Sequence, residues 1–340
     1  MEIGSEEKLE ELISNPGSET IKLLSRLDGD IIILGIGGKI GPSLAYMAKS
    51  ASYMAGVKKK IIGVSQFKNE DLQKSLNNIG IETIKGDLLD AKFLKSLPNV
   101  KNVFFLAGMK FGSMENPSLT WAINSYLPGL VVEHFKKSKI VAFSTGCVYP
   151  LVPYDTSGSK EQDIPIALGE YAQSCLGRER ILEYSSQRFG TPVTIIRLNY
   201  SVELRYGVLV DIAFKVKNNQ AVNLDMGYFN AIWQGDLNNY VLRSLELAKS
   251  PAMILNITGS EVLSVRQVAL EFGNLFEVEV RFTGQESQTA LLSNSNLAYS
   301  LLGKPNTPVS SIIEWTAQWM KNDGVLLGKP THFEVRDGKY

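Results

Sequence analysis

The sequence predicts an α/β protein built on a doubly wound parallel sheet, with a smaller C-terminal substrate-binding part. Two observations lead to this fold class. Between residues 31 and 200, short apolar segments alternate with longer segments of helical periodicity, which is typical of parallel βαβ units. The first apolar segment, 31–34, also runs directly into a glycine-rich turn and then a helix, as in sheets that bind dinucleotides. The predicted fold is therefore Rossmann-like.

The chain begins with two amphipathic segments, which we expect to form helices at 6–14 and 18–27. Strands and helices then alternate in chain order. The predicted strands are 31–35, 60–64, 81–85, 101–106, 139–144 and 192–198. The predicted helices between them are 42–54, 69–78, 90–96, 117–136 and 168–188. Beyond residue 200 we expect helices at 208–218, 236–249, 264–275 and 309–321, and one apolar strand at 253–257.

These elements divide the chain into three predicted parts. Residues 1–29 form an N-terminal helical extension, 30–200 a dinucleotide-binding domain, and 201–340 mainly a substrate-binding part with a C-terminal tail. We expect the strand near 253–258 to return to the sheet of the dinucleotide-binding domain. The glycines and charges of the tail, from residue 328 onward, suit either a loose end or a strap over the binding pocket.

The glycine-rich turn is the most informative local feature. Gly35, Gly38 and Gly41 would allow a tight turn, close approach of a phosphate and close packing of the following helix. That helix would then point its first amide groups at an anion. The sequence therefore predicts a site for the pyrophosphate of a dinucleotide.

Composition argues against several classes of function. Basic and acidic residues both number 35, and no basic stripe alternates with aromatic residues, so we expect no nucleic-acid partner. No apolar run approaches the roughly 18 residues of a membrane span, and we expect a cytoplasmic protein without a membrane partner. With two cysteines and two histidines in the chain, we expect neither a metal site nor a histidine-based triad.

Several motifs follow one another in a characteristic order. They are Gly35–Gly41, Gly86–Asp90, Leu106–Gly108, Asn124, Ser144–Pro150 and Tyr171. In this order they resemble the extended short-chain dehydrogenases, the NAD-dependent epimerase and dehydratase group, over about residues 30–260. The resemblance implies an NAD(P)-dependent enzyme acting on a small-molecule substrate.

The resemblance also implies the residues that would bind the cofactor. These are Gly35, Gly37, Gly38, Lys39, Ile40, Gly41, Ser65, Gln66, Phe67, Asp87, Leu88, Leu106, Ala107, Gly108, Asn124, Ser144, Cys175 and Leu198. Where an NAD enzyme usually carries an acid that binds the adenosine ribose, the chain has Ser65 and Gln66. Because Ser65 and Lys39 are compatible with a 2′-phosphate, we favour NADP over NAD.

In the family that the chain resembles, a tyrosine exchanges a proton with the substrate oxygen, and a lysine four residues later supports it. Here Tyr171 is followed by Cys175 at that position. A neutral thiol is a poor donor and cannot lower the pKa of the tyrosine as an ammonium does. Cys175 is either a small buried residue or a redox thiol paired with Cys147. Another cation must then act, or the chemistry differs.

Lys110 is our candidate for this cation, because it follows the 106–108 turn at the edge of the sheet where ligands bind. Arg178 and Arg180 are alternatives on the helix that carries Tyr171. Thr145 is expected to bond the same substrate oxygen as the tyrosine. The predicted catalytic residues are therefore Tyr171, Thr145 and Lys110.

The substrate side departs from the pattern of family members that bind nucleotide sugars, which usually carry a Pro-Arg loop after the last strand. This chain has 201–207 there, without a proline. We therefore expect a sugar, sugar acid or related polyol derivative rather than a nucleotide sugar. The predicted substrate residues are Gly146, Cys147, Asn199, Tyr200, Arg205, Asn230, Trp233 and Gln234. Trp233 is equally compatible with a place in the core.

The leading hypothesis is an NAD(P)-dependent oxidoreductase, epimerase or dehydratase. Its rivals are a non-catalytic dinucleotide-binding sensor or scaffold, and a redox-neutral isomerase or lyase with a tightly held cofactor. By resemblance, helices 117–136 and 168–188 would pair with their copies in a homodimer.

Overall fold

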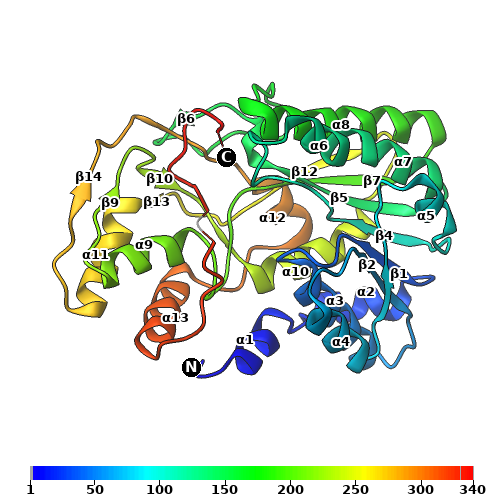
Figure 1. Ribbon diagram of the computed structural model, residues 1–340, viewed down its shortest axis with the longest axis horizontal. Helices are drawn as coiled ribbons and strands as arrows, with labels where there is room; N and C mark the ends of the chain where they lie inside the picture. The colour runs from blue at the N-terminus through cyan, green and yellow to red at the C-terminus, as the bar shows by residue number, and fades with distance from the viewer. Residues whose placement is uncertain (1–2, 330, 340) are drawn as a thin grey trace.

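The structure is a computed structural model that describes residues 3–329 and 331–339. Its centre is a parallel sheet of seven strands, in the order β12-β7-β5-β4-β1-β2-β3 (Figure 1). The strands are β1 (Ile31–Leu34), β2 (Ile61–Ser65), β3 (Glu82–Lys85), β4 (Asn102–Phe105), β5 (Lys139–Thr145), β7 (Val193–Leu198) and β12 (Met253–Ile257). The predicted fold class is confirmed. The strand near residue 253 pairs with β7 at one edge of the sheet.

Helices cover both faces of the sheet, because successive side chains of a strand point to opposite faces. Ile31 and Ile33 of β1 lie in one core and Ile32 and Leu34 in another. The first core is covered by α2 (Ser18–Arg26), α3 (Gly41–Met54), α4 (Glu70–Asn78), α10 (Gln234–Arg243) and α12 (Asn296–Leu302). The second core is covered by α5 (Ala91–Ser96), α7 (Leu127–His134) and α8 (Gly169–Phe189).

The helix predicted at 117–136 is not continuous. It consists of α6 (Pro117–Trp121), a π-helical turn at Ala122–Tyr126 and α7. Pro128, in the first turn of α7, has no N–H for the regular ladder, which is compatible with the irregular turn before it. The irregular turn matters for the site, because it carries Asn124.

Two other helices differ from expectation. The one predicted at 236–249 ends at Arg243 and continues as a 3₁₀ turn, Ser244–Glu246. Helix α12 was not predicted, because its seven residues are too few for a clear helical pattern.

A third core lies beside the sheet. It is built by α1 (Glu6–Ile13), α9 (Val208–Lys217), α11 (Val265–Phe276) and α13 (Val309–Lys321). The chain also forms four two-stranded ribbons: β6 (Val152–Pro153) with β15 (Thr289–Ala290), β8 (Ser201–Val202) with β11 (Ile232–Trp233), β9 (Val222–Asn223) with β14 (Phe282–Thr283), and β10 (Tyr228–Phe229) with β13 (Leu263–Ser264). The N-terminal helices are therefore part of the packed molecule, α1 in this third core and α2 against the sheet.

The C-terminal tail after α13 runs back across the molecule and ends near the start of α8 (Figure 1). Thr331 donates to Asp211 of α9 at 2.8 Å through its amide and 2.5 Å through its hydroxyl. Arg336 donates to Thr289, at 2.7 Å from the backbone oxygen and 2.7 Å from the hydroxyl. The tail was expected to be either a loose end or a strap. These contacts show that its described part is a strap.

In the described part of the chain, no helix combines the length and the apolar character that crossing a membrane requires.

Candidate active site

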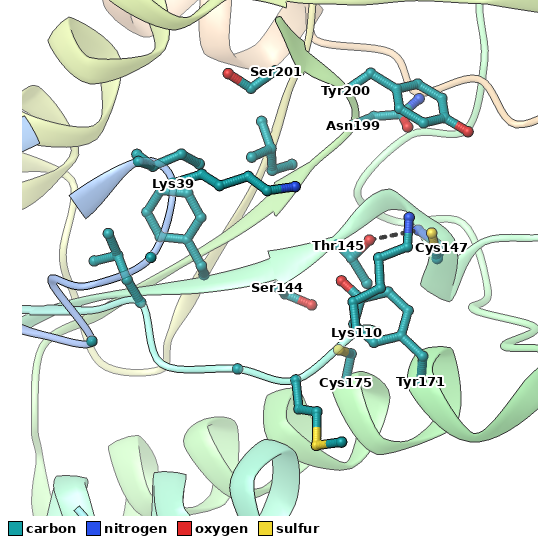
Figure 2. Close-up of a pocket in the computed structure, with 18 of the residues that line it drawn as sticks. Lys39, Lys110, Ser144, Thr145, Cys147, Tyr171, Cys175, Asn199, Tyr200 and Ser201 are labelled. Carbon is teal, nitrogen blue, oxygen red and sulfur yellow. Dashed lines mark hydrogen bonds between the residues drawn. The ribbon is translucent and has the colours of Figure 1, made fainter. Parts of the chain in front are cut away.

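A cavity of about 350 Å³ opens where β1, β4, β5 and β7 end (Figure 2). This is the carboxyl edge of the sheet, where open α/β folds bind their ligands. Among the predicted residues, the cavity is lined by Gly35, Gly38, Lys39, Ile40, Gly41, Leu106, Gly108, Lys110, Asn124, Ser144, Thr145, Cys147, Tyr171, Cys175, Leu198, Asn199, Tyr200 and Gln234. The structure thus brings together the three predicted catalytic residues with most of the glycine turn.

The glycine turn is shaped as a phosphate cradle requires. Gly35 has a φ of +91°, and a Cβ there would lie 2.6 Å from the amide nitrogen of Ala107. A Cβ on Gly38 would meet no protein atom closer than 3.5 Å. Helix α3 begins at Gly41 without a side-chain cap, so the amides of its first turn are available to an anion. These residues fit a dinucleotide pyrophosphate.

Gly38 offers a sharp test of this fit. We expect Gly38→Ala to fold with nearly unchanged stability, since the added methyl group meets no close protein atom, yet to weaken NAD binding at least about tenfold by occupying the ligand's path. Gly4→Ala is the matched control, because Gly4 is an exposed glycine that also has space for a Cβ, is not in the left-handed backbone region and lies outside the cavity. Calorimetric titration with NAD and thermal unfolding measure both effects. Equal NAD affinity in the variant and the wild type would place the pyrophosphate elsewhere.

Tyr171 lies half-buried at the start of α8, facing the cavity. Burial raises its pKa well above the usual value, the nearby thiols of Cys175 and Cys147 raise it further, and a hydrogen bond with the Thr145 side chain opposes the shift. Thr145 also accepts a hydrogen bond from the amide of Cys147 at 3.1 Å. At neutral pH the phenol therefore keeps its proton and can donate it to a substrate oxygen.

Cys175 lies directly beneath Tyr171 and is 2% exposed. Burial raises the pKa of its thiol to about 12, so the sulfur stays neutral. A neutral thiol places no positive charge beside Tyr171, as the sequence predicts for a cysteine at this position.

Lys110 reaches the same place from the turn after β4. Its ammonium lies 5.9 Å from the centre of the Tyr171 ring and donates to the backbone oxygen of Thr331 at 3.2 Å. Burial lowers its pKa, while Cys147, Asp211 and Cys175 raise it. Lys110 thus places an amine beside the ring of Tyr171.

The alternative cations serve other purposes. Arg178 lines the cavity, but its guanidinium donates to the backbone oxygens of Asn124 and Phe143 at 3.1 and 2.7 Å. Arg180 is exposed and pairs with Glu183 at 2.8 Å. Arg180 is therefore a surface residue. Arg178 is held by the backbone, but its positive charge still lowers the pKa of Tyr171.

Asn124 holds the turn that carries Lys110. Its side-chain oxygen accepts from the amide of Met109 at 2.9 Å and from Arg178 at 2.8 Å, and its nitrogen donates to the Met109 carbonyl at 2.8 Å. The irregular helical turn at 122–126 thus fixes the backbone beside the cavity.

Polar residues form the opposite side of the cavity. Asn199 donates to Asn230 at 2.9 Å, and Asn230 donates to the Ser293 carbonyl at 2.7 Å. Gln234 donates to Ser43 of α3 at 2.8 Å. Asn230 therefore lies behind Asn199 and positions it instead of lining the cavity.

Two predicted substrate residues lie elsewhere. Arg205 pairs with Glu203 at 3.2 Å and Glu10 at 2.7 Å, outside the cavity. Trp233 is 3% exposed and packs edge-on against Trp315, with ring centres 5.6 Å apart. Arg205 and Trp233 were wrongly predicted for the same reason. Each side chain contacts a structural partner that cannot be recognised from its position in the sequence.

The residues predicted for the adenine end also lie outside this cavity, together with Gly37, Ala107 and Gly146. Phe67 and Leu88 are buried in the two cores that flank the sheet. Asp87 accepts from the amide of Leu89 at 2.9 Å. For Ser65, Gln66, Phe67, Asp87 and Leu88, contact with the adenosine stays a prediction.

Several lining residues were not predicted. They are Met109, Phe111, Phe143, Ser201, Tyr206, Val208 and Thr331. Met109 and Phe111 adjoin Lys110, so their nearness to the site could have been inferred from the turn. Thr331 gave no such indication, because it comes from the tail, 221 positions beyond Lys110.

Comparison with known proteins now identifies the family. Residues 31–202 match the model of the NAD dependent epimerase/dehydratase family. The chain belongs to this family. The resemblance inferred from the ordered motifs is confirmed. A search of curated proteins gives no match.

Solved structures share the fold of this family member. An epimerase from Methanothermobacter thermautotrophicus is 20% identical, with a TM-score of 0.73 over 91% of this chain and 97% of the other. A UDP-glucuronic acid 4-epimerase mutant from Bacillus cereus, in complex with a fluorinated UDP-glucuronic acid and NAD, is 16% identical, with a TM-score of 0.72 over 86% and 99%. A dTDP-glucose 4,6-dehydratase from Streptomyces venezuelae, with NAD and TYD bound, is 15% identical, with a TM-score of 0.72 over 86% and 97%.

The preference for NADP gains no support. The family is described as NAD dependent, and the Bacillus and Streptomyces structures contain NAD. Lys39, which we expected to pair with a 2′-phosphate, points into the cavity, with its ammonium 3.1 Å from the centre of the Tyr206 ring.

Proposed function

We propose that this chain is an NAD-dependent enzyme that oxidises, or transiently oxidises, a hydroxyl-bearing carbon of a sugar derivative. The observation that carries the proposal is the meeting of Tyr171, Thr145 and Lys110 in one cavity that begins at the glycine turn. Membership of the NAD-dependent epimerase/dehydratase family supports it.

Each residue has a distinct task in this proposal. NAD, when bound, would accept hydride from the substrate carbon and return it in the reverse step. In its phenolate form, Tyr171 would take the proton of the substrate hydroxyl, and as the phenol it would give the proton back, while Thr145 holds the substrate oxygen within bonding distance. The ammonium of Lys110 would stabilise the phenolate, in place of the family lysine whose position we assign to Cys175.

We propose a sugar derivative as the substrate class. The expectation that the sugar carries no nucleotide has no support from the neighbours, whose names include a UDP-sugar epimerase and a dTDP-sugar dehydratase. Arg205, the arginine among the predicted substrate residues, lies outside the cavity. Free sugars, sugar acids and nucleotide sugars therefore all enter the test.

The test is a substrate screen with NAD. NADH absorbance detects net oxidation, and mass spectrometry or chromatography of the sugar detects epimerisation or elimination without net redox change. Turnover that requires NAD supports the proposal. NAD binding without turnover of any of the three classes would favour a non-catalytic sensor, and absence of NAD binding at millimolar concentration would overturn the cofactor assignment as well.

We also propose that the chain is a homodimer formed through α6 to α8. Trp121, Tyr126 and Tyr184 are 39%, 59% and 61% exposed on these helices. A Cβ on Gly177 would lie 3.4 Å from the Trp121 ring, and Tyr184 follows Gly177 by two helical turns on the same face. An aromatic surface of this kind is typical of an interface.

We expect Tyr184→Glu to convert the dimer to a monomer, because it replaces an aromatic contact at the interface with a carboxylate that must be taken out of water. Light scattering during size-exclusion chromatography measures the mass. Tyr53→Glu is the control, since Tyr53 is 86% exposed on α3, against the other face of the sheet. A wild-type protein that is a monomer would refute this interface. A Tyr184→Glu variant that remains a dimer would refute it as well.

A further inference from the structure

The C-terminal tail takes part in the active-site cavity through Thr331. This residue lines the cavity and is 4% exposed. Its backbone oxygen accepts a hydrogen bond from the amine of Lys110 at 3.2 Å, and the same amine lies 5.9 Å from the centre of the Tyr171 ring. The tail therefore supplies an acceptor for the residue that we propose as the cation of the site.

Asp211 of α9 holds Thr331 in place. Its Oδ2 atom accepts from the amide of Thr331 at 2.8 Å and from the hydroxyl at 2.5 Å. The same hydroxyl accepts from the amide of Phe333 at 3.3 Å. These bonds fix the backbone on both sides of the Thr331 carbonyl, so they set the direction in which its oxygen points.

The residues that follow keep the tail in register with the turn that carries Lys110. The ring of His332 lies against that of Phe111, with centres 5.9 Å apart. Each of these residues directly follows one partner of the bond between Thr331 and Lys110. Phe333 comes next and is 2% exposed in the third core. Three consecutive tail residues are thus fixed by α9, by the turn after β4 and by the third core.

The end of the tail reaches the helix that carries Tyr171. A Cβ on Gly338 would lie 2.3 Å from the backbone oxygen of Leu168, and a Cβ on Gly169 would lie 2.2 Å from that of Gly338. Helix α8 begins at Gly169, two residues before Tyr171. The tail therefore packs closely against the start of this helix as well as against the turn of Lys110.

We propose that Asp211 is a positioning residue, which acts through the tail to keep the amine of Lys110 beside Tyr171. The inference rests on the proposed function, in which this amine stabilises the phenolate. A lysine four residues after the tyrosine would be held on the same face by the helix itself. Here the amine comes from a different element, so its position depends on contacts with other parts of the chain. Asp211 does not line the cavity, and its effect passes through Thr331.

Two substitutions of Asp211 separate this hold from a simple effect of charge, since its carboxylate also raises the pKa of Lys110. Asparagine keeps an acceptor oxygen without the charge. We expect Asp211→Ala to lower kcat for sugar oxidation by about 10–100-fold, the usual effect of a misplaced group, and to move the rise of the rate to higher pH. Asp211→Asn should keep most of the wild-type rate. Equal losses in both variants would overturn the inference.

A double variant and a matched control exclude a general loosening of the tail. In Lys110→Met, adding Asp211→Ala should not shift the pH profile further, because the group that it positions is gone. Glu334→Gln removes another link between the tail and α9, the ion pair with Lys215 at 3.3 Å, and should leave the profile unchanged. A further shift in the double variant, or a shift in Glu334→Gln, would contradict a specific role of Asp211.

Crystal structures of the full-length variants give a readout that does not need turnover. We expect the amine of Lys110 to leave the Thr331 oxygen in Asp211→Ala and to keep it in Asp211→Asn. Thr331→Val, which lacks the hydroxyl, should release the amine as well, and Thr331→Ser should retain it. An amine that stays in place in Asp211→Ala and Thr331→Val would overturn the inference. If no sugar is turned over, the proposed function falls, and the position of the amine alone decides whether Asp211 holds it.

Discussion

Replacing Tyr171 with phenylalanine should lower kcat by about 10²–10⁴-fold, the usual contribution of a positioned acid or base. The change removes one oxygen from a half-buried ring, so the packing of Val148, Tyr149 and Cys175 around it should persist. NAD affinity should remain close to that of the wild type, because the phosphate cradle is formed by another part of the chain. Steady-state kinetics with the substrate found in the screen, together with NAD titration, measure both quantities.

The pH dependence tests the mechanism behind this loss. Burial and the nearby thiols raise the pKa of Tyr171, so the rate of substrate oxidation, which needs the phenolate, should rise with pH. Lys110→Met removes a positive charge near the ring and should move this rise to still higher pH. Full activity in Tyr171→Phe would end the assignment of the acid/base. If the pH profile of Lys110→Met were identical to that of the wild type, Lys110 could not be the cation that acts on Tyr171.

Glu179→Ala should lower the free energy of unfolding by about 3–5 kcal/mol, because it leaves a buried arginine without its counter-charge. Glu179 and Arg197 are 0% and 1% exposed, and their closest atoms are 2.6 Å apart. Glu179 also accepts from Ser144 at 2.5 Å, so the change should disturb one wall of the cavity. Urea denaturation followed by circular dichroism measures the effect.

Helix α8 supplies its own control. Glu183 pairs with the exposed Arg180, whose side chain is 55% exposed, and Glu183→Ala should cost no more than about 1 kcal/mol. Similar losses for the two alanine variants would show that the buried charge of Glu179 does not set the cost. The double variant Glu179→Ala with Arg197→Met should recover part of the stability, because it removes both charges.

Much of the fold could be predicted from local sequence. The run of four isoleucine and leucine residues at 31–34 suits a strand covered on both faces, and Gly35 occupies a backbone conformation that few other residues adopt. Such preferences act between near neighbours in the chain. For the same reason the resemblance of ordered motifs located Tyr171, Thr145 and the glycine turn correctly in one cavity.

The sequence by itself therefore determined the parallel sheet, the position of the glycine turn and the absence of a lysine at position 175. Only the tertiary structure decided which side chains meet. Lys110 lies beside Tyr171 and binds the backbone of Thr331, a residue 221 positions away, whereas Arg205 turns away to glutamates and Trp233 to the core. Contacts of this range depend on how the tail, α9 and the sheet pack together, and no local preference of the chain encodes them.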